Sequence, residues 1–206
     1  VIGTVRSGDG VYEGSGGLQG TTLLKCDVGD EESIKNAAHS YKNAKLPAIT
    51  HIIYNAGVYG PRAPFGEVKA QDMLEVFKIN TIGPLLVAQY FIPLMGNGNG
   101  KTKHKPVLGI LSSKVGSVDD NGSGGSYAYR ASKSALNICA KSLSIDLQDN
   151  IKVVLLHPGY VRTDMTGGNG LIDPHESVTG MLRAIEATDD STAFRWVDYK
   201  ACLIPW

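Results

Sequence analysis

The sequence is poor in cysteine, carries no net charge and has no long apolar run. Only three of its 206 residues are cysteines, Cys26, Cys139 and Cys202, and no two form a CxxC pair. This argues against a disulfide framework or a cysteine-based zinc site, and favours a reducing compartment such as the cytoplasm. Because 20 basic residues balance 20 acidic ones, no overall field attracts nucleic acid or anionic lipid. No apolar run approaches the roughly 20 residues that span a bilayer.

Sites for metals or nucleic acid are also not indicated. The five histidines lack HxxxH and HxH spacing, so we expect no metal site. The short basic run 101–105 has no accompanying aromatic residues and is interpreted as a solvated loop. The first residues, Val1–Val5, have neither an initiating methionine nor the pattern of a signal peptide. They are instead typical of the middle of a strand.

What the sequence does contain is an alternation of short aliphatic runs with helical patterns. We expect strands at Val1–Val5, Thr21–Lys25, Ile49–Tyr54, Pro106–Leu111 and Lys152–Leu156. Each run is apolar on both faces, which is typical of a parallel sheet covered on both sides. Apolar spacing predicts helices at about 30–41, 73–91, 128–147 and 173–188. Residues 1–206 are therefore predicted to form a single α/β domain with a doubly wound, mostly parallel sheet.

Ligands of such sheets bind beyond the carboxyl ends of the strands, and unusual polar segments lie at those places. Tyr129 and Lys133 are four residues apart, so a helix would hold their side chains about 5–6 Å from each other. An ammonium group near a phenol lowers its pKa from about 10, which suits a general acid–base. Ser112 and Ser113 follow a buried strand and could donate a hydrogen bond to a substrate carbonyl oxygen.

Two further strand ends complete the pattern. After Tyr54, the run Asn55-Ala56-Gly57 lets a flat ligand approach the backbone closely. The segment His157–Thr163 leaves the last expected strand through a sharp Pro-Gly turn, after which a threonine hydroxyl could return to the same ligand. Each segment alone also fits an ordinary turn or helix, but the four together, in this order, are specific.

In this order the segments resemble the short-chain dehydrogenase/reductase family, from Val1 to about Met165 and more loosely beyond. The resemblance implies a Rossmann-like fold and a catalytic tetrad of Asn80, Ser113, Tyr129 and Lys133. Tyr129 would exchange the proton and Ser113 would orient the carbonyl or hydroxyl group. Lys133 would hold the nicotinamide ribose and lower the pKa of Tyr129. Asn80 would hold a helix distortion and a water molecule in a proton relay.

Two details refine the site that the resemblance implies. Ser113 is favoured over Ser112 because the family pattern is Ser-x-x-Gly, and Gly116 sets the register. The gap from Ser113 to the tyrosine is longer than usual. It contains the loop Ser117–Ser126, which we expect to be mobile and to border the substrate. The shape of the substrate pocket would also depend on Tyr59–Phe65 and on Thr166–Ile172, which are irregular, so the substrate itself stays open.

The resemblance also implies a bound dinucleotide, NADP(H). Arg6 follows the first strand, where NADP-preferring members carry a base, and a guanidinium binds a phosphate with two hydrogen bonds. A solvated Arg6 is the alternative. The other cofactor contacts that the resemblance implies, besides Tyr129 and Lys133, are Asp27, Val28, Asn55, Ala56, Gly57, Pro158, Gly159, Val161 and Thr163.

The family's first strand, its Gly-rich phosphate-binding loop and its first helix have no counterpart in residues 1–206. Gly8–Gly14 reads GxGxxxG, but no helical pattern follows it, so Ser7–Gly20 is interpreted as a flexible connection between two strands. If the resemblance holds, we expect the chain to be N-terminally truncated relative to the family by one βα unit of about 30 residues. In the strand order 3-2-1-4-5-6 this leaves a slot between Val1–Val5 and Ile49–Tyr54. Either these strands close up or another segment fills the slot, and we expect weak NADPH binding and slow turnover.

The predicted activity is NADPH-dependent reduction of a ketone or aldehyde to an alcohol. The run His157–Met165 and the closing Ile204–Trp206 are similar to the branch that contains carbonyl reductase, sniffer and C-factor proteins. A regulatory or scaffold protein, or a fragment, is the alternative. A sugar-nucleotide epimerase is disfavoured because few residues follow the last motif. The expected partners are a small carbonyl or alcohol substrate and a second copy of the chain, in a homodimer or homotetramer built on helices 73–91 and 128–147. No nucleic acid or membrane partner is expected.

Overall fold

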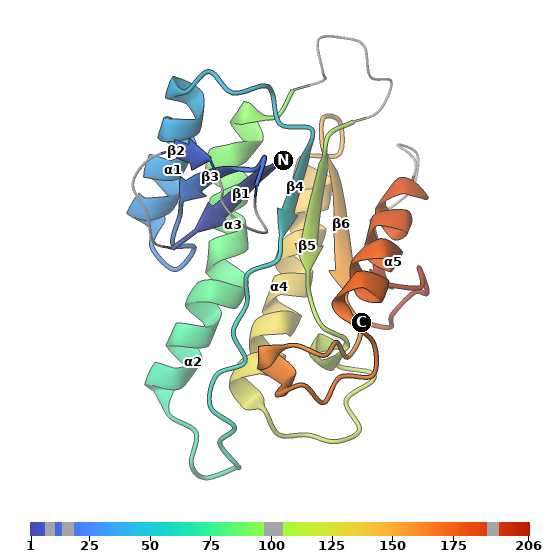
Figure 1. Ribbon diagram of the computed structural model, residues 1–206. Coiled ribbons are helices and arrows are strands. Elements are labelled where there is room, and N and C mark those ends of the chain that lie inside the picture. Colours follow the sequence, from blue (N-terminus) through green and yellow to red (C-terminus); the bar gives the residue numbers. More distant parts are fainter. Residues whose placement is uncertain (7–10, 14–18, 97–104, 189–193) are drawn as a thin grey trace.

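The computed structural model describes residues 1–6, 11–13, 19–96, 105–188 and 194–206, whose strands form two sheets (Figure 1). In the smaller sheet, β1 (Ile2–Val5) is parallel to β3 (Thr22–Lys25), and β2 (Val11–Glu13) is antiparallel to the other edge of β3. The larger sheet is entirely parallel and has the order β4-β5-β6-β7. Its strands are β4 (His51–Tyr54), β5 (Val107–Leu111), β6 (Lys152–His157) and β7 (Arg195–Asp198).

The helices begin where the sequence supplies caps. In α1 (Glu31–Asn43) the Asp30 carboxylate accepts a hydrogen bond from the backbone of Glu32, and in α5 (Pro174–Glu186) Asp173 caps Glu176 in the same way. Helix α2 (Ala70–Phe77) continues through a π-helical turn, Lys78–Ile82, into α3 (Gly83–Phe91). Helix α4 spans Tyr127–Asp146. Short 3-10 turns occupy Ile92–Leu94, Lys114–Gly116 and Asp164–Thr166.

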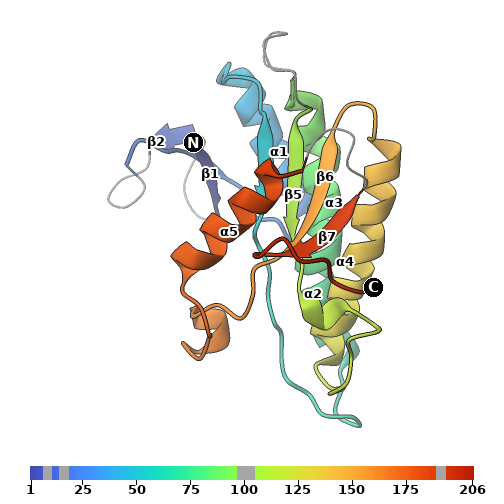
Figure 2. The same cartoon turned by 90° about the vertical axis from the view of Figure 1, so that its right-hand side faces the viewer.

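Helices α1, α3 and α4 cover one face of the strands, and α5 covers the opposite face of the larger sheet (Figures 1 and 2). The first core joins both sheets, because Leu24 of β3 and Cys26 just after it belong to the same buried cluster as Leu108 of β5 and Leu155 of β6. The second core lies between α5 and the larger sheet. The two sheets are therefore held together by a shared helical layer.

The predicted fold class and the expected strands and helices are confirmed, with ends shifted by a few residues. Two short strands were not predicted. The interpretation of Ser7–Gly20 as a flexible connection is wrong at Val11–Glu13, which pairs with β3; residues 7–10 and 14–18 lie outside the described part. Strand β2 has only three residues, which are too few to show a period. Neither alternative for the slot is seen, since β1 and β4 lie in separate sheets.

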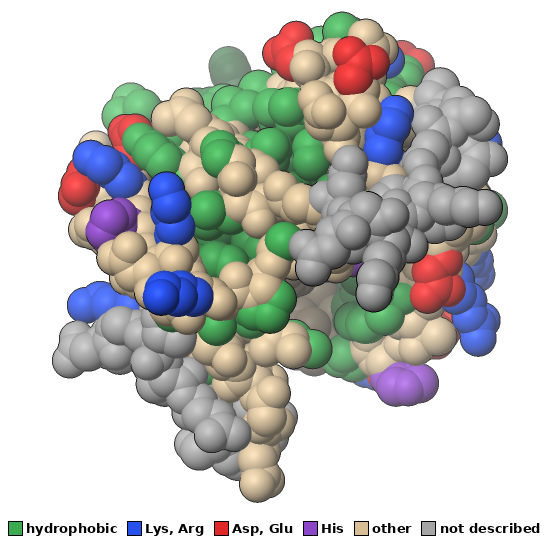
Figure 3. All heavy atoms as spheres, turned by 90° about the horizontal axis from the view of Figure 1, so that it is seen from above, with side chains coloured by type: hydrophobic (Ala, Val, Ile, Leu, Met, Phe, Trp, Pro, Cys, Tyr) green, Lys and Arg blue, Asp and Glu red, His purple; other side chains and the backbone are tan. Residues whose placement is uncertain are grey.

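Strands β4, β5 and β6 run toward the end of the molecule at which α4 begins (Figure 1). Figure 3 shows the opposite end, where basic and acidic side chains are interspersed with apolar ones. This mixture fits the zero net charge of the sequence.

Within the described ranges, no helix combines the length and hydrophobicity needed to cross a bilayer.

Candidate active site

Two serines follow β5, and their hydroxyl groups have different partners. Ser112 donates a hydrogen bond of 2.6 Å to Oδ1 of Asn137 on α4, while Ser113 is hydrogen-bonded to the phenol of Tyr129. The next turn lies directly on α4, because a Cβ at Gly116 would come within 2.7 Å of Cβ of Lys133. Glycine is therefore needed at this close approach, which brings Ser113 beside Tyr129.

Tyr129 and Lys133 lie in the first two turns of α4, on its buried face. Nζ of Lys133 is 5.8 Å from the centre of the Tyr129 ring and donates a hydrogen bond of 2.9 Å to the Leu111 carbonyl oxygen. Burial lowers the pKa of Lys133 to about 8. Burial also raises the pKa of Tyr129, which the hydrogen bond from Ser113 opposes and the neighbouring Tyr59 reinforces.

This corrects one expectation from the sequence. Lys133 was expected to lower the pKa of Tyr129, but burial dominates and the pKa of Tyr129 is raised. Removing the phenol from water disfavours its charged form, and the ammonium group of Lys133 is directed at a backbone carbonyl. A phenol is protonated at neutral pH, the form that can donate a proton, and burial strengthens this preference.

Asn80 lies in the π-helical turn between α2 and α3 and is fully buried. Its Oδ1 accepts a hydrogen bond of 2.9 Å from the backbone N–H of Val58, and its Nδ2 donates to the Val58 carbonyl at 2.8 Å and to Oγ of Ser132 at 3.0 Å. The distortion implied by the family resemblance is therefore present at this residue. Asn80 connects the segment after β4 to α4.

The end of β4 leaves room beside the lysine. A Cβ at Gly57 would lie 3.7 Å from Nζ of Lys133 and 3.4 Å from Oδ1 of Asn80. Glycine at this position keeps a space next to both polar groups, as a ribose held by Lys133 would require. The residues present here therefore fit a nucleotide cofactor.

The other predicted cofactor contacts are spread over both sheets. Arg6 is exposed after β1, and Asp27 after β3 accepts a hydrogen bond of 2.9 Å from the backbone of Gly29. The remaining positions lie in the segments after β3, β4 and β6: Val28 packs against the first core, Asn55 is exposed, and Ala56, Pro158, Gly159 and Val161 are partly buried. Thr163 caps a 3-10 turn by a reciprocal hydrogen-bond pair with Thr166. Of this set, Gly57 lies beside the side chains of two tetrad members, Asn80 and Lys133.

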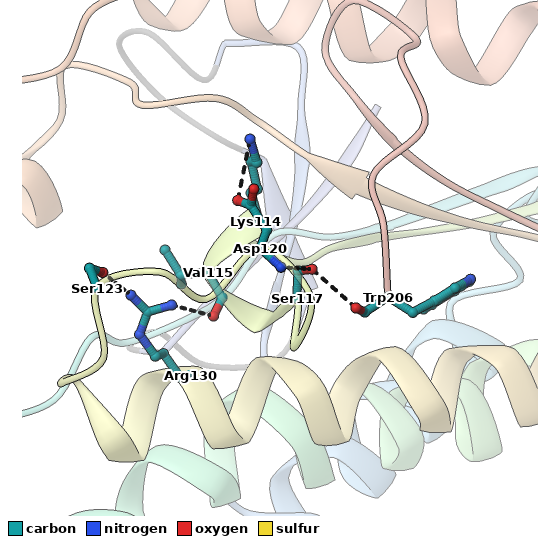
Figure 4. Close-up of polar contacts among 7 residues, drawn as sticks. All are labelled: Lys114, Val115, Ser117, Asp120, Ser123, Arg130 and Trp206. Carbon is teal, nitrogen blue, oxygen red and sulfur yellow. Dashed lines mark hydrogen bonds and ion pairs between the residues drawn. The ribbon is translucent and has the colours of Figure 1, made fainter.

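The loop Ser117–Ser126, expected to be mobile, is held at several points (Figure 4). The Arg130 guanidinium donates hydrogen bonds to the carbonyl oxygens of Val115 and Gly124 and to Oγ of Ser123. Lys114 pairs with Asp120 at 3.3 Å. The Trp206 carbonyl accepts hydrogen bonds from the backbone N–H of Asp119 and from Oγ of Ser117. The loop is thus tied to α4 and to the last residue of the chain.

Sequence reasoning did not identify the residues that support the tetrad. Arg130 and Asn137 lie on α4 within the helix that was predicted, but only the fold shows that they bind the segments after β5. Tyr59 was noted only as part of an irregular segment. Its ring packs against Tyr129 in the structure, a contact between residues 70 positions apart that no local pattern reveals.

Comparison with known proteins agrees with this geometry. The family model for the short chain dehydrogenases matches residues 14–170, most of the chain. The chain belongs to the short-chain dehydrogenase family. C-signal of Myxococcus xanthus is 39% identical to it over 156 residues, covering 75% of this chain and 91% of that protein.

Two solved structures of carbonyl reductases are similar to this short-chain dehydrogenase. The NADPH-bound enzyme from chicken fatty liver superposes with a TM-score of 0.81 at 31% identity, covering 90% of this chain and 77% of that one. Carbonyl reductase Sniffer of D. melanogaster gives 0.84 at 29% identity, covering 90% and 78%. The predicted branch of carbonyl-reductase, sniffer and C-factor-like proteins is confirmed.

Proposed function

We propose that this short-chain dehydrogenase uses NADPH to reduce a ketone or aldehyde to an alcohol, and that residues 1–206 act as one domain. The observation that carries the proposal is the buried cluster of Asn80, Ser113, Tyr129 and Lys133 at the carboxyl ends of β4 and β5. A carbonyl oxygen next to the phenol and the serine would meet two donors, as the reaction needs. The NADPH bound to a similar carbonyl reductase supports the choice of cofactor.

The chemistry that NADPH would supply when held here is the hydride, from C4 of its nicotinamide, that the carbonyl carbon accepts. Ser113 donates a hydrogen bond to the carbonyl oxygen, and Tyr129 transfers its phenolic proton to the same oxygen, which completes the alcohol. Lys133, with a pKa of about 8, is mostly charged at neutral pH. Lys133 and the space at Gly57 would hold the ribose. Asp27 and Val28 would contact the adenine, and the segments 55–57 and 158–163 would line the remainder of the cofactor.

Transfer of the label from NADPH deuterated at C4 tests this function. The protein is incubated with the labelled cofactor and a panel of aliphatic, aryl and conjugated ketones and aldehydes, and the alcohols are analysed by mass spectrometry. We expect one deuterium at the carbinol carbon of at least one product, formed slowly by this chain. A folded protein that yields no labelled alcohol from any carbonyl would instead support the regulatory or scaffold alternative.

Arg6 is proposed to select NADPH over NADH by binding the additional phosphate. Replacing Arg6 by Ala should weaken NADPH binding by about tenfold, because one charge-assisted contact is lost, and should change NADH binding much less. Isothermal titration calorimetry measures both affinities, with the cofactor raised to millimolar concentration because weak binding is expected. Arg195→Ala, which removes an exposed arginine from β7, is the matched control. Equal weakening of both dinucleotides by Arg6→Ala would contradict the assignment.

We also propose that the protein forms a homodimer or homotetramer through α2–α3 and α4, in a cytoplasmic location that its three free cysteines support. Leu74, Ile82, Ile138 and Ile145 are all exposed on these helices, with Ile138 64% exposed. Large apolar side chains gathered on such helices favour burial against a second copy. Size-exclusion chromatography with light scattering should give the mass of two or four chains, and a monomer at micromolar concentration would contradict this interface.

A further inference from the structure

A second tyrosine lies flat against Tyr129. The ring of Tyr59, from the segment after β4, stacks on the Tyr129 ring with centroids 4.5 Å apart and planes inclined by 22°. The Cζ atom of Arg62 lies 4.8 Å from the centre of the Tyr59 ring. Stacked aromatic pairs and cations over a ring each add to the stability of such a packing. The stack therefore constrains the plane of the Tyr129 ring.

The Tyr59 side chain is held at both of its ends. Its hydroxyl lies 2.8 Å from Oγ of Ser126, the residue that precedes α4 and lies three positions before Tyr129. At the backbone end, the adjacent Val58 makes two hydrogen bonds with Asn80. Tyr59 thus links the segment after β4, the π-helical turn and the start of α4 around one ring.

Ser126 adopts a conformation that serine rarely takes. With φ of 47° and ψ of 43° it is left-handed, which costs a residue with a side chain about 1 kcal/mol or more. Its hydroxyl does not cap α4 and is instead hydrogen-bonded to the hydroxyl of Tyr59. The strained residue is therefore part of the contact that closes over Tyr129.

We propose that Tyr59 is a positioning residue, which fixes the ring of Tyr129 in its donating orientation and keeps water from one face of that ring. The inference rests on the proposed function, in which Tyr129 donates the proton. Tyr129 is only 9% exposed, and the Tyr59 ring supplies part of its cover. Tyr59 itself does not need to touch the substrate, since it acts through Tyr129.

A titration without turnover separates this role from general packing. In protein labelled with 3-fluorotyrosine, the fluorine resonance of Tyr129 is identified by its loss in Tyr129→Phe and followed against pH. The groups that face this phenol are Lys133 on α4, Ser113 after β5 and Tyr59 with Arg62 behind it. We expect Tyr59→Ala to move the midpoint to lower pH, because water reaches the ring and stabilises the phenolate. Tyr59→Phe keeps the ring and should therefore shift the Tyr129 midpoint less.

Kinetics provide the second readout. Tyr59→Ala should lower kcat by about 3- to 10-fold, the value of one aromatic pair, with a smaller change in KM. Tyr59→Phe should retain most of kcat. Tyr127→Phe, which alters the partly exposed tyrosine at the start of α4, is the control and should leave both constants unchanged. Ser126→Gly removes the hydroxyl partner and relieves the left-handed strain, so it stays folded and should lower kcat about as much as Tyr59→Phe.

The outcomes distinguish this inference from the proposed function. An unchanged Tyr129 midpoint in both Tyr59→Ala and Ser126→Gly overturns the positioning role, whatever the activity of the chain. If Tyr59→Ala changes KM and leaves kcat unchanged, the positioning role is also overturned, and Tyr59 instead lines the substrate pocket. A parent protein that never reduces a carbonyl overturns the proposed function, while the titration still reports whether Tyr59 covers Tyr129.

Discussion

Replacing Tyr129 by phenylalanine is expected to lower kcat for carbonyl reduction by about 10²- to 10⁴-fold, the usual contribution of a general acid. The substitution removes only the hydroxyl and its hydrogen bond with Ser113. The ring keeps its burial and its stacking on Tyr59, so the fold is preserved. The decrease in NADPH absorbance with a carbonyl substrate measures the rate, and the label-transfer experiment identifies the product.

Tyr127→Phe again serves as the control, because it removes a phenol two residues away that lies outside the cluster. Its rate should equal that of the parent. Tyr129→Phe should also keep the thermal stabilisation by NADPH, since Lys133 and Gly57 are untouched. If Tyr129→Phe retained a third or more of the parental kcat, Tyr129 would not be the proton donor.

Asn80→Ala is expected to give the largest loss of stability of any substitution discussed here. It removes three hydrogen bonds and leaves the N–H and C=O of Val58 without these partners, beside the buried Ser132. Unpaired buried groups cost about 1–3 kcal/mol each, so we expect a loss of about 3 kcal/mol in unfolding free energy. Thermal unfolding should report this as a decrease in Tm of about 6–12 °C.

Activity should fall together with stability, because Asn80 anchors the backbone next to Tyr59. The matched control is Asn36→Ala, which removes an exposed asparagine from α1 and should change the unfolding free energy by less than about 0.5 kcal/mol. A similar Tm for the two variants would mean that the hydrogen bonds of Asn80 do not hold the site together.

The sequence predicts those parts of the fold whose packing follows a simple period. In α1, the apolar residues Ile34, Ala37, Ala38 and Tyr41 recur with the helical spacing from which the helix was predicted, and they form its buried face. Strands β5 and β6 of the larger sheet were predicted because they are almost wholly buried and therefore apolar throughout, whereas β7 of the same sheet was not predicted. Spacing and strand ends pointed to Tyr129, Lys133 and the two serines, and the resemblance added Asn80 and the choice of Ser113. The structure brings the four residues together.

Helix α4 shows why the remainder was not predicted. Ile138 is apolar and yet exposed, while the buried face includes Ser132, Lys133 and Asn137. An apolar count assigns the wrong face to a helix whose buried side carries the polar groups of a site. The separation of the two sheets and the contact of Trp206 with the loop after β5 depend on pairings between distant segments, which no local pattern encodes.

Thermal unfolding of this chain with NADPH, compared with NADH at the same concentration, tests the central claim most directly. At ten times Kd, NADPH should stabilise the folded protein by about 1.4 kcal/mol and raise Tm by about 3–6 °C. NADH should raise it much less. A cooperative transition whose Tm is unchanged by either dinucleotide, even at millimolar concentration, would contradict an NADPH site at these strand ends.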